Sequence, residues 1–153
     1  MTRKAIAKDF FENLDRPTIV EAIRRAEAKG LGEIRVHLQH GRVADARKAA
    51  EATFLRLGMN QTVHRTGCLI FIAPEVRSFA VVGDVAVHEK VGDAFWHAAR
   101  DAAAARFAEG RFAEGIVAAI DRIGDVLAEH FPRRPGEKDV DELPNEVSEG
   151  EKP

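Results

Sequence analysis

The sequence has little of several features that would point directly to a function. Its 153 residues contain one cysteine, one tryptophan and no tyrosine, and the formal net charge is only −2. One cysteine cannot form an internal disulfide, and a balanced charge provides no field that attracts nucleic acid. No apolar run approaches the roughly 20 residues that a membrane-spanning helix needs. We therefore predict a domain that binds no nucleic acid and does not insert into a membrane.

The usual catalytic templates are also missing from the chain. It contains no phosphate-binding Gly-Lys-Ser/Thr loop, no nucleophile elbow, no HExxH motif and no paired CxxC motifs. The one cysteine, Cys68, lies in an apolar run, which is typical of a buried and inert thiol. The amino terminus is basic but has no apolar signal-peptide region, so we expect a cytoplasmic protein. Whether the protein is an enzyme stays open at this point.

What is present is a regular series of amphipathic segments over residues 1–131, which predicts one domain. Asp15 and Pro17 indicate a helix start, and Gly30 indicates its end. The expected elements are, in chain order, a helix between Asp15 and Gly30, a strand over 33–38, a helix over 43–57, strands over 67–73 and 78–83, and helices over 91–108 and 112–130.

This order predicts an α/β fold with a small mixed sheet of three or four strands and helices packed on it. Residues 33–73 form one right-handed βαβ crossover, so the first two strands should be parallel. Residues 67–83 read as a β-hairpin around the turn at 74–77. The continuous apolar run at 67–73 predicts a central strand covered on both faces. Alternation of polar and apolar residues at 33–38 predicts a strand with one exposed face.

The composition changes after residue 131. Residues 132–153 are acidic, rich in Pro and Gly, and poor in large apolar side chains, which is typical of a largely disordered tail. Val140 and Leu143 are the side chains through which part of this tail could still dock on the domain.

Several segments, in the right order, resemble the motifs of the TPM domain family, over about residues 12–145. They are Gly32-Glu33-Ile34-Arg35-Val36-His37, Arg65-Thr66-Gly67-Cys68-Leu69-Ile70-Phe71-Ile72-Ala73, Phe79-Ala80-Val81-Val82-Gly83-Asp84, Val91-Gly92-Asp93-Ala94-Phe95-Trp96, Phe107-Ala108-Glu109-Gly110-Arg111-Phe112-Ala113-Glu114-Gly115 and Asp141-Glu142-Leu143-Pro144. The resemblance implies that this chain is a short, bacterial, cytoplasmic member of the family.

Two kinds of function follow from this resemblance. The family includes a membrane-anchored receptor modulator, and a thylakoid-lumen protein described as an acid phosphatase in photosystem II repair. The first expectation is an accessory or interaction domain that binds a protein partner and assists a membrane-associated or other complex. The alternative is a phosphatase-like hydrolase, with or without metal assistance. The oligomeric state is left open.

One set of polar residues should meet at a single edge of the sheet. Glu33 begins the first strand, Arg65 and Thr66 lead into the second, and Asp84 ends the third. Parallel first and second strands with an antiparallel third strand bring these four positions together. We take them as candidate catalytic residues, beside the simpler reading that Arg65 pairs with Glu33 or Asp84 on the surface.

The same edge is the candidate metal site. Two neighbouring carboxylates repel each other, which favours a bound cation, and oxygen ligands favour calcium or magnesium. The candidate ligands are Glu33 and Asp84, with His64 and His88 as further ligands if they turn inward.

Overall fold

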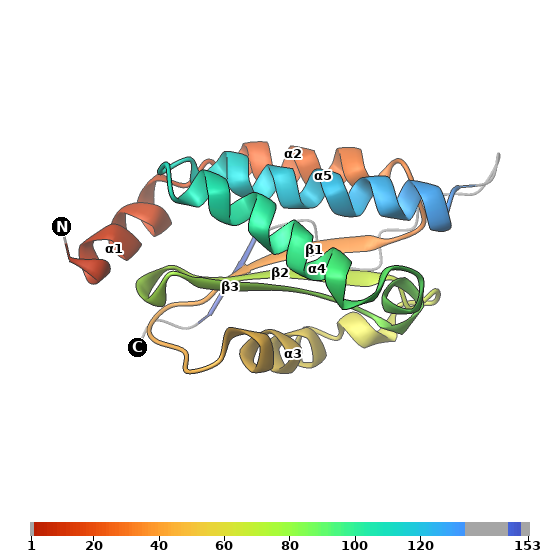
Figure 1. The fold of residues 1–153 in the computed structure, drawn as a ribbon, viewed down its shortest axis with the longest axis horizontal. Helices are drawn as coiled ribbons and strands as arrows, with labels where there is room; N and C mark the ends of the chain where they lie inside the picture. Colours follow the sequence, from red (N-terminus) through yellow and green to blue (C-terminus); the bar gives the residue numbers. More distant parts are fainter. Residues whose placement is uncertain (1, 134–146, 151–153) are drawn as a thin grey trace.

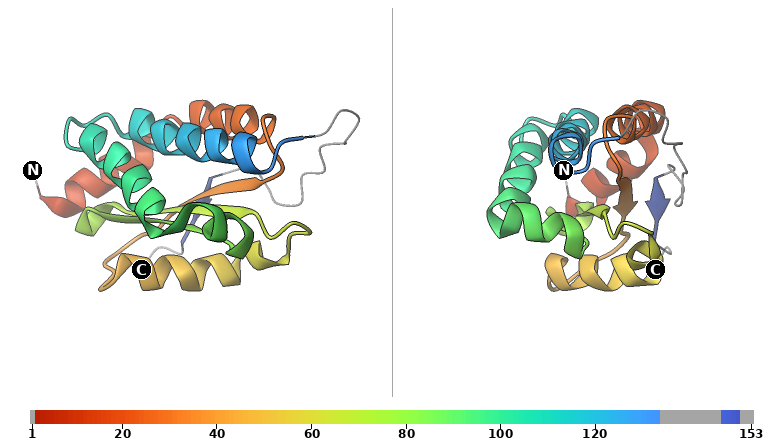
Figure 2. Two further views of the ribbon diagram at one scale, coloured as in Figure 1. Left: turned by 45° about the vertical axis from the view of Figure 1, so that its right-hand side comes forward. Right: turned by 90° about the vertical axis from the view of Figure 1, so that its right-hand side faces the viewer.

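The computed structural model describes residues 2–133 and 147–150. Its centre is a four-stranded sheet in the order β3-β2-β1-β4. Helices α2, α4 and α5 cover one face, and α3 covers the other (Figure 1). The views in Figure 2 show the same two layers of helix with the sheet between them. The predicted α/β class is confirmed.

The two predicted strand pairings are also confirmed. β1 (Glu33–Leu38) runs parallel to β2 (Gly67–Ala73), and β2 runs antiparallel to β3 (Ser78–Gly83). All seven residues of β2 are buried, as expected for a central strand. The hairpin turn between β2 and β3 contains a short 3-10 helix, Pro74–Val76.

The expectation that β1 exposes one face is wrong. All six of its residues are buried, including the charged or polar Glu33, Arg35 and His37. One reason is that the polar ring of His37 finds partners inside the fold. The His37 ring stacks against Phe71 of β2 with the ring centroids 5.6 Å apart. Alternation therefore marked two chemically different faces, but both faces are covered.

Sequence reasoning left two elements out. α1 (Arg3–Asn13) begins at Thr2, whose hydroxyl accepts a hydrogen bond from the Ala5 amide. β4 (Ser148–Glu149) lies within the segment predicted to be a tail and pairs in parallel with the end of β1. It supplies the fourth strand that the prediction had left open. Val140 and Leu143 lie outside the described residues.

The helices begin and end largely as their capping residues predict. α2 (Arg16–Glu27) is capped by Asp15, and α3 (Ala46–Arg56) is capped by Asp45 and followed by Gly58 at φ 72°. α5 (Phe112–His130) has the expected bounds and buries an apolar stripe. A Cβ at Gly124 of α5 would lie 2.8 Å from the Cβ of Ala26, so this glycine allows α5 and α2 to approach closely.

α4 (Val85–Phe107) starts at Val85 and not at Val91 as expected. The carboxylate of Asp84 caps it by accepting a hydrogen bond from the Val85 amide at 2.7 Å. Gly92 interrupts the helix with φ 71° and ψ 178°, so two helical segments meet at this residue. The break explains why the expected helix began at Val91, next to Gly92, and left out residues 85–90.

Candidate functional site

The predicted polar residues do occupy one edge of the sheet. Glu33 is paired with Gly67, and Cys68 with Gly83, at the start of β2. The Asp84 amide donates to the Gly67 carbonyl at 2.8 Å. The backbone therefore brings the start of β1, the start of β2 and the end of β3 to one place, as the topology predicted.

The centre of this edge is an ion pair between Arg65 and Asp84. The guanidinium donates from Nε to Oδ2 at 2.7 Å and from Nη2 to Oδ1 at 2.9 Å. The Asp84 side chain is only 4% exposed, whereas that of Arg65 is 45% exposed. The hydrogen bonds and charge of Asp84 raise the pKa of the Arg65 guanidinium. We call this pair the Arg65–Asp84 clasp, because it joins the loop before β2 to the start of α4.

The clasp limits the chemistry that Asp84 can perform. Its Oδ1 also accepts from the Val85 amide, so three donors already use a carboxylate with about four acceptor sites. The Ala86 amide further donates to the Arg65 carbonyl at 3.2 Å, and Arg65 itself has φ 55°. This arrangement positions a loop and begins a helix. It leaves the Arg65 side chain 45% exposed.

The other candidates lie nearby in different roles. Glu33 and Thr66 are buried, and the Glu33 amide donates to the Thr66 carbonyl at 3.4 Å. The sulfur of Cys68 is buried beside the same carbonyl, and burial raises the pKa of its thiol. An inert Cys68 thiol is what the apolar sequence around it had indicated.

The two histidines named as further metal ligands, His64 and His88, have different surroundings. Nδ1 of His88 accepts a hydrogen bond from the indole Nε1 of Trp96 at 3.0 Å, whereas His64 is exposed. Within residues 2–133 and 147–150, no group of three or more His, Cys, Asp or Glu side chains is arranged to hold a metal ion. A calcium or magnesium site at Glu33 and Asp84 stays a prediction.

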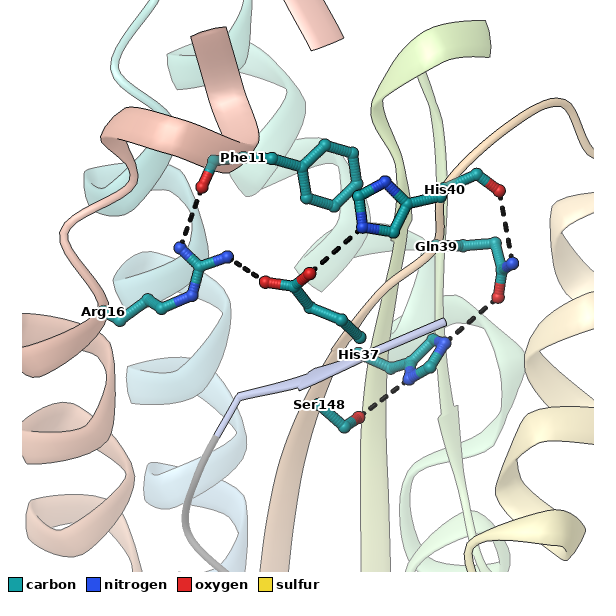
Figure 3. A network of polar contacts seen from close by, with 7 residues as sticks. Phe11, Arg16, His37, Gln39, His40 and Ser148 are labelled. Atoms are coloured by element: carbon teal, nitrogen blue, oxygen red, sulfur yellow. Dashed lines mark hydrogen bonds and ion pairs between the residues drawn. The ribbon is translucent and has the colours of Figure 1, made fainter. Parts of the chain in front are cut away.

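A second polar site lies at the opposite end of β1, and sequence reasoning missed it. His37 Nδ1 lies 2.7 Å from the Ser148 hydroxyl, and its Nε2 lies 3.1 Å from Oε1 of Gln39. Glu149 pairs with Arg16 and, at 3.0 Å, with Nε2 of His40 (Figure 3). We call these contacts the β4 network.

Two aromatic and electrostatic features complete the β4 network. The His40 ring stacks on Phe11 of α1 with the centroids 3.7 Å apart. Burial lowers the pKa of His37, and the hydrogen bond with Gln39 only partly opposes this effect. Burial raises the pKa of Glu149, but the bonds from His40 and Arg16 hold it below its usual value. The sequence gave little indication of this site, because β4 contributes only two polar residues, Ser148 and Glu149, from a segment that reads as an acidic tail.

These features define an α/β domain with an open mixed sheet between two helix layers. The match to the TPM domain extends over residues 7–126, and the chain belongs to this family. The family resemblance is therefore confirmed. Among the described residues, no helix combines the length and the apolar character needed to cross a membrane.

Several solved structures are similar to this chain, among them two bacterial proteins. BA42 protein from the psychrophilic bacterium Bizionia argentinensis is 39% identical, with a TM-score of 0.80, over 88% of this chain and 92% of BA42. The N-terminal domain of cg2496 protein from Corynebacterium glutamicum is 20% identical, with a TM-score of 0.57, over 72% of this chain and 70% of that chain. The second likeness concerns the fold alone. No curated protein matches this chain.

Proposed function

We propose that this protein is a TPM accessory domain that binds a protein partner through the end of the molecule that carries the Arg65–Asp84 clasp. The observation that carries the proposal is the placement of exposed apolar side chains. Among the described residues, three large hydrophobic side chains are exposed: Leu55 at 61%, Val63 at 78% and Val85 at 51%. Single exposed apolar residues are common, but their gathering in one region favours an interaction surface.

All three residues belong to this end of the fold. Val63 lies two residues before Arg65, and Val85 directly follows Asp84, so both belong to the segments that the clasp joins. Leu55 is in the last turn of α3, which leads through the 3-10 helix Met59–Gln61 into the same loop. In Figure 1, the end of α3, the start of β2 and the start of α4 lie on the same side.

The chemistry of this end suits a protein partner. Apolar side chains around a half-exposed arginine combine two features that are enriched at protein interfaces. Asp84 holds the guanidinium of Arg65 in a fixed position, so little conformational entropy is lost when a partner contacts it. An acidic group on the partner would complement Arg65.

Capture from detergent-solubilised host membranes tests the proposal. The immobilised protein should retain a specific protein, identified by mass spectrometry, and Val63→Asp should lose it. The matched control is Ala105→Asp, which adds the same charge at an exposed position in the last part of α4. Retention by the wild type and by Ala105→Asp but not by Val63→Asp supports the proposal. Equal retention by all three proteins, or by none of them, contradicts it.

A phosphatase-like hydrolase is the second candidate. In its favour, the backbones of Glu33 and Thr66 lie at the same end of the sheet as the paired side chains of Arg65 and Asp84. It ranks lower because Arg65 and the Val85 amide already bind Asp84. Phosphomonoester hydrolysis should be measured with and without calcium, magnesium and zinc. Turnover that survives stringent purification and disappears in both Glu33→Gln and Asp84→Asn would reverse the order of the two candidates.

A further inference from the structure

We infer that a cavity beside α1 is a binding site for a small carboxylate with a flexible apolar chain, such as a medium-chain fatty acid. The cavity has a volume of about 340 Å³ and lies between α1, the turn that joins β2 to β3, the end of α4 and the start of α5 (Figure 1). Ala73 pairs with Ser78 at this end of the hairpin, whereas Cys68 pairs with Gly83 at the end that carries the clasp. The cavity is therefore separate from the surface of the proposed function.

The walls of the cavity are mainly apolar and come from several elements. The cavity is lined by Ile6 and Phe10 of α1, Phe79 of β3, Phe107 of α4 and Phe112 of α5, among others. Protein interiors are closely packed and contain few voids larger than a water molecule. Ligand pockets are typically about 300–1,000 Å³ in volume and predominantly apolar. The size and lining of this cavity therefore match a site for a small ligand.

The ring orientations favour a flexible chain over a flat ring as the apolar part of the ligand. The Phe10 and Phe112 rings meet at 69°. The Phe107 ring meets Phe79 at 74° and Phe112 at 50°. None of these pairs offers two parallel faces between which a flat aromatic group could stack. An aliphatic chain can follow walls at such angles, because it can turn at each carbon–carbon bond.

The charge of the lining indicates the other part of the ligand. Among the described residues that line the cavity, Arg77 alone is charged. Its side chain is exposed, and it forms no hydrogen bond or ion pair with residues 2–133 or 147–150. A guanidinium binds a carboxylate through two parallel hydrogen bonds. An anionic head group at Arg77, with its chain among the phenylalanine rings, would complement both parts of the cavity.

The backbone at Arg77 gives further support. Its φ of 52° and ψ of 38° lie in the left-handed region, where glycine is the usual residue. The Arg77 amide donates to the Pro74 carbonyl at 3.1 Å, which closes the turn beside the cavity. An arginine in this unfavourable conformation points to a use for its side chain.

Calorimetric titration of the full chain with decanoate tests the inference. The wild type should bind decanoate saturably. Decyltrimethylammonium has the same chain with a positive charge, and acetate has the carboxylate without the chain. Each should bind at least about ten-fold more weakly than decanoate, because each lacks one of the two interactions. Naphthoate, a flat aromatic carboxylate, should also bind more weakly than decanoate.

Two pairs of variants locate the binding. Arg77→Glu should weaken decanoate binding at least about ten-fold, whereas Arg122→Glu, the same charge change at an exposed position of α5, should not. Ala104→Phe should abolish binding by filling the cavity, whereas Ala105→Phe, at the exposed neighbouring position of α4, should leave it unchanged. Because Arg77 is exposed, the first pair tests the inference even if Ala104→Phe fails to fold.

Several results would overturn the inference. These are no saturable binding of decanoate, equal binding of decanoate and its cationic analogue, tighter binding of naphthoate, or equal effects of Arg77→Glu and Arg122→Glu. A dimer of the wild type that Ala104→Phe abolishes would make a second copy of this chain the occupant, against the inferred ligand. Partner capture through Val63 should be unchanged in Arg77→Glu, so failure of this site would leave the proposed function standing.

Discussion

The two ends of β1 each hold a carboxylate paired with an arginine, and the two pairs differ in burial. Asp84 is 4% exposed, accepts two bonds from Arg65 and caps α4. Glu149 is 36% exposed and lies in a strand of two residues. The buried carboxylate of Asp84 is therefore held more firmly than the partly solvated carboxylate of Glu149.

Asp84→Ala should have the largest effect. We expect a loss of about 2–3 kcal/mol in the free energy of unfolding, because the start of α4 loses its cap and a charged hydrogen-bond partner. Asp84→Asn should lose about 1 kcal/mol, since an amide oxygen can still cap the helix. Urea denaturation measures both. A smaller loss for Asp84→Ala than for Glu149→Ala would contradict the conclusion that the clasp stabilises the fold more than the Glu149 pair does.

Acid should lower the free energy of unfolding, and His37 of the β4 network should account for part of this loss. The folded-state pKa of His37 lies below its ordinary value of 6.5, mainly because of burial. Below about pH 6.5 the unfolded chain therefore binds more protons than the folded one, and stability falls with a slope of at most about 1.4 kcal/mol per pH unit until the folded pKa is passed.

The difference in unfolding free energy between about pH 7.5 and pH 5.5 should be measured for the wild type and for His37→Gln. His37→Gln should reduce this difference, because a glutamine does not titrate. An unchanged difference would mean that His37 does not carry the effect.

Glu149→Ala should cost less than about 1 kcal/mol, because its partners and its own carboxylate are partly solvated. Thermal unfolding at low and high salt measures the loss, which should shrink as salt screens the pair. A loss equal to that of Asp84→Ala would show that β4 is as firmly integrated into the fold as the clasp.

Val63→Asp should have the smallest effect on stability, within about 0.5 kcal/mol, since its side chain is exposed. If stability is unchanged, a loss of partner capture by this variant reports on the surface and not on unfolding. Circular dichroism during thermal unfolding measures it. A large drop in melting temperature would show that Val63 supports the clasp itself.

The sequence was sufficient for the central elements because their signals are local and strong. The apolar run of β2 and the cap at Asp15 are each readable within a few residues. The start of α3 was placed at Val43, three residues before its actual start at Ala46, because the cap at Asp45 was not recognised. α1 was missed because it buries only Ala7 and Phe10, which gives little helical periodicity. β4 was missed because its contacts are backbone pairs and polar side chains, which leave no apolar pattern.

The candidate site was predictable to a similar degree. The order and direction of the strands placed Glu33, Arg65 and Asp84 at one edge, because they determine which strand ends lie side by side. They could not show that Asp84 is buried and caps α4, since the capping bond depends on the φ and ψ angles of one residue. The accessory role, the partner, the cytoplasmic location and the bacterial origin stay predictions.

The break in α4 has a consequence for chirality. A Cβ at Gly92 would meet no atom within 4 Å, so space does not require glycine there. The backbone does, because φ 71° with ψ 178° is a region that L-residues essentially avoid, at a cost of about 1–3 kcal/mol. For a D-residue, the same angles lie close to the mirror image of the extended region that L-residues commonly adopt. D-alanine should therefore fit at position 92 where L-alanine does not. The break in α4 restricts the chirality of this residue but not the size of its side chain.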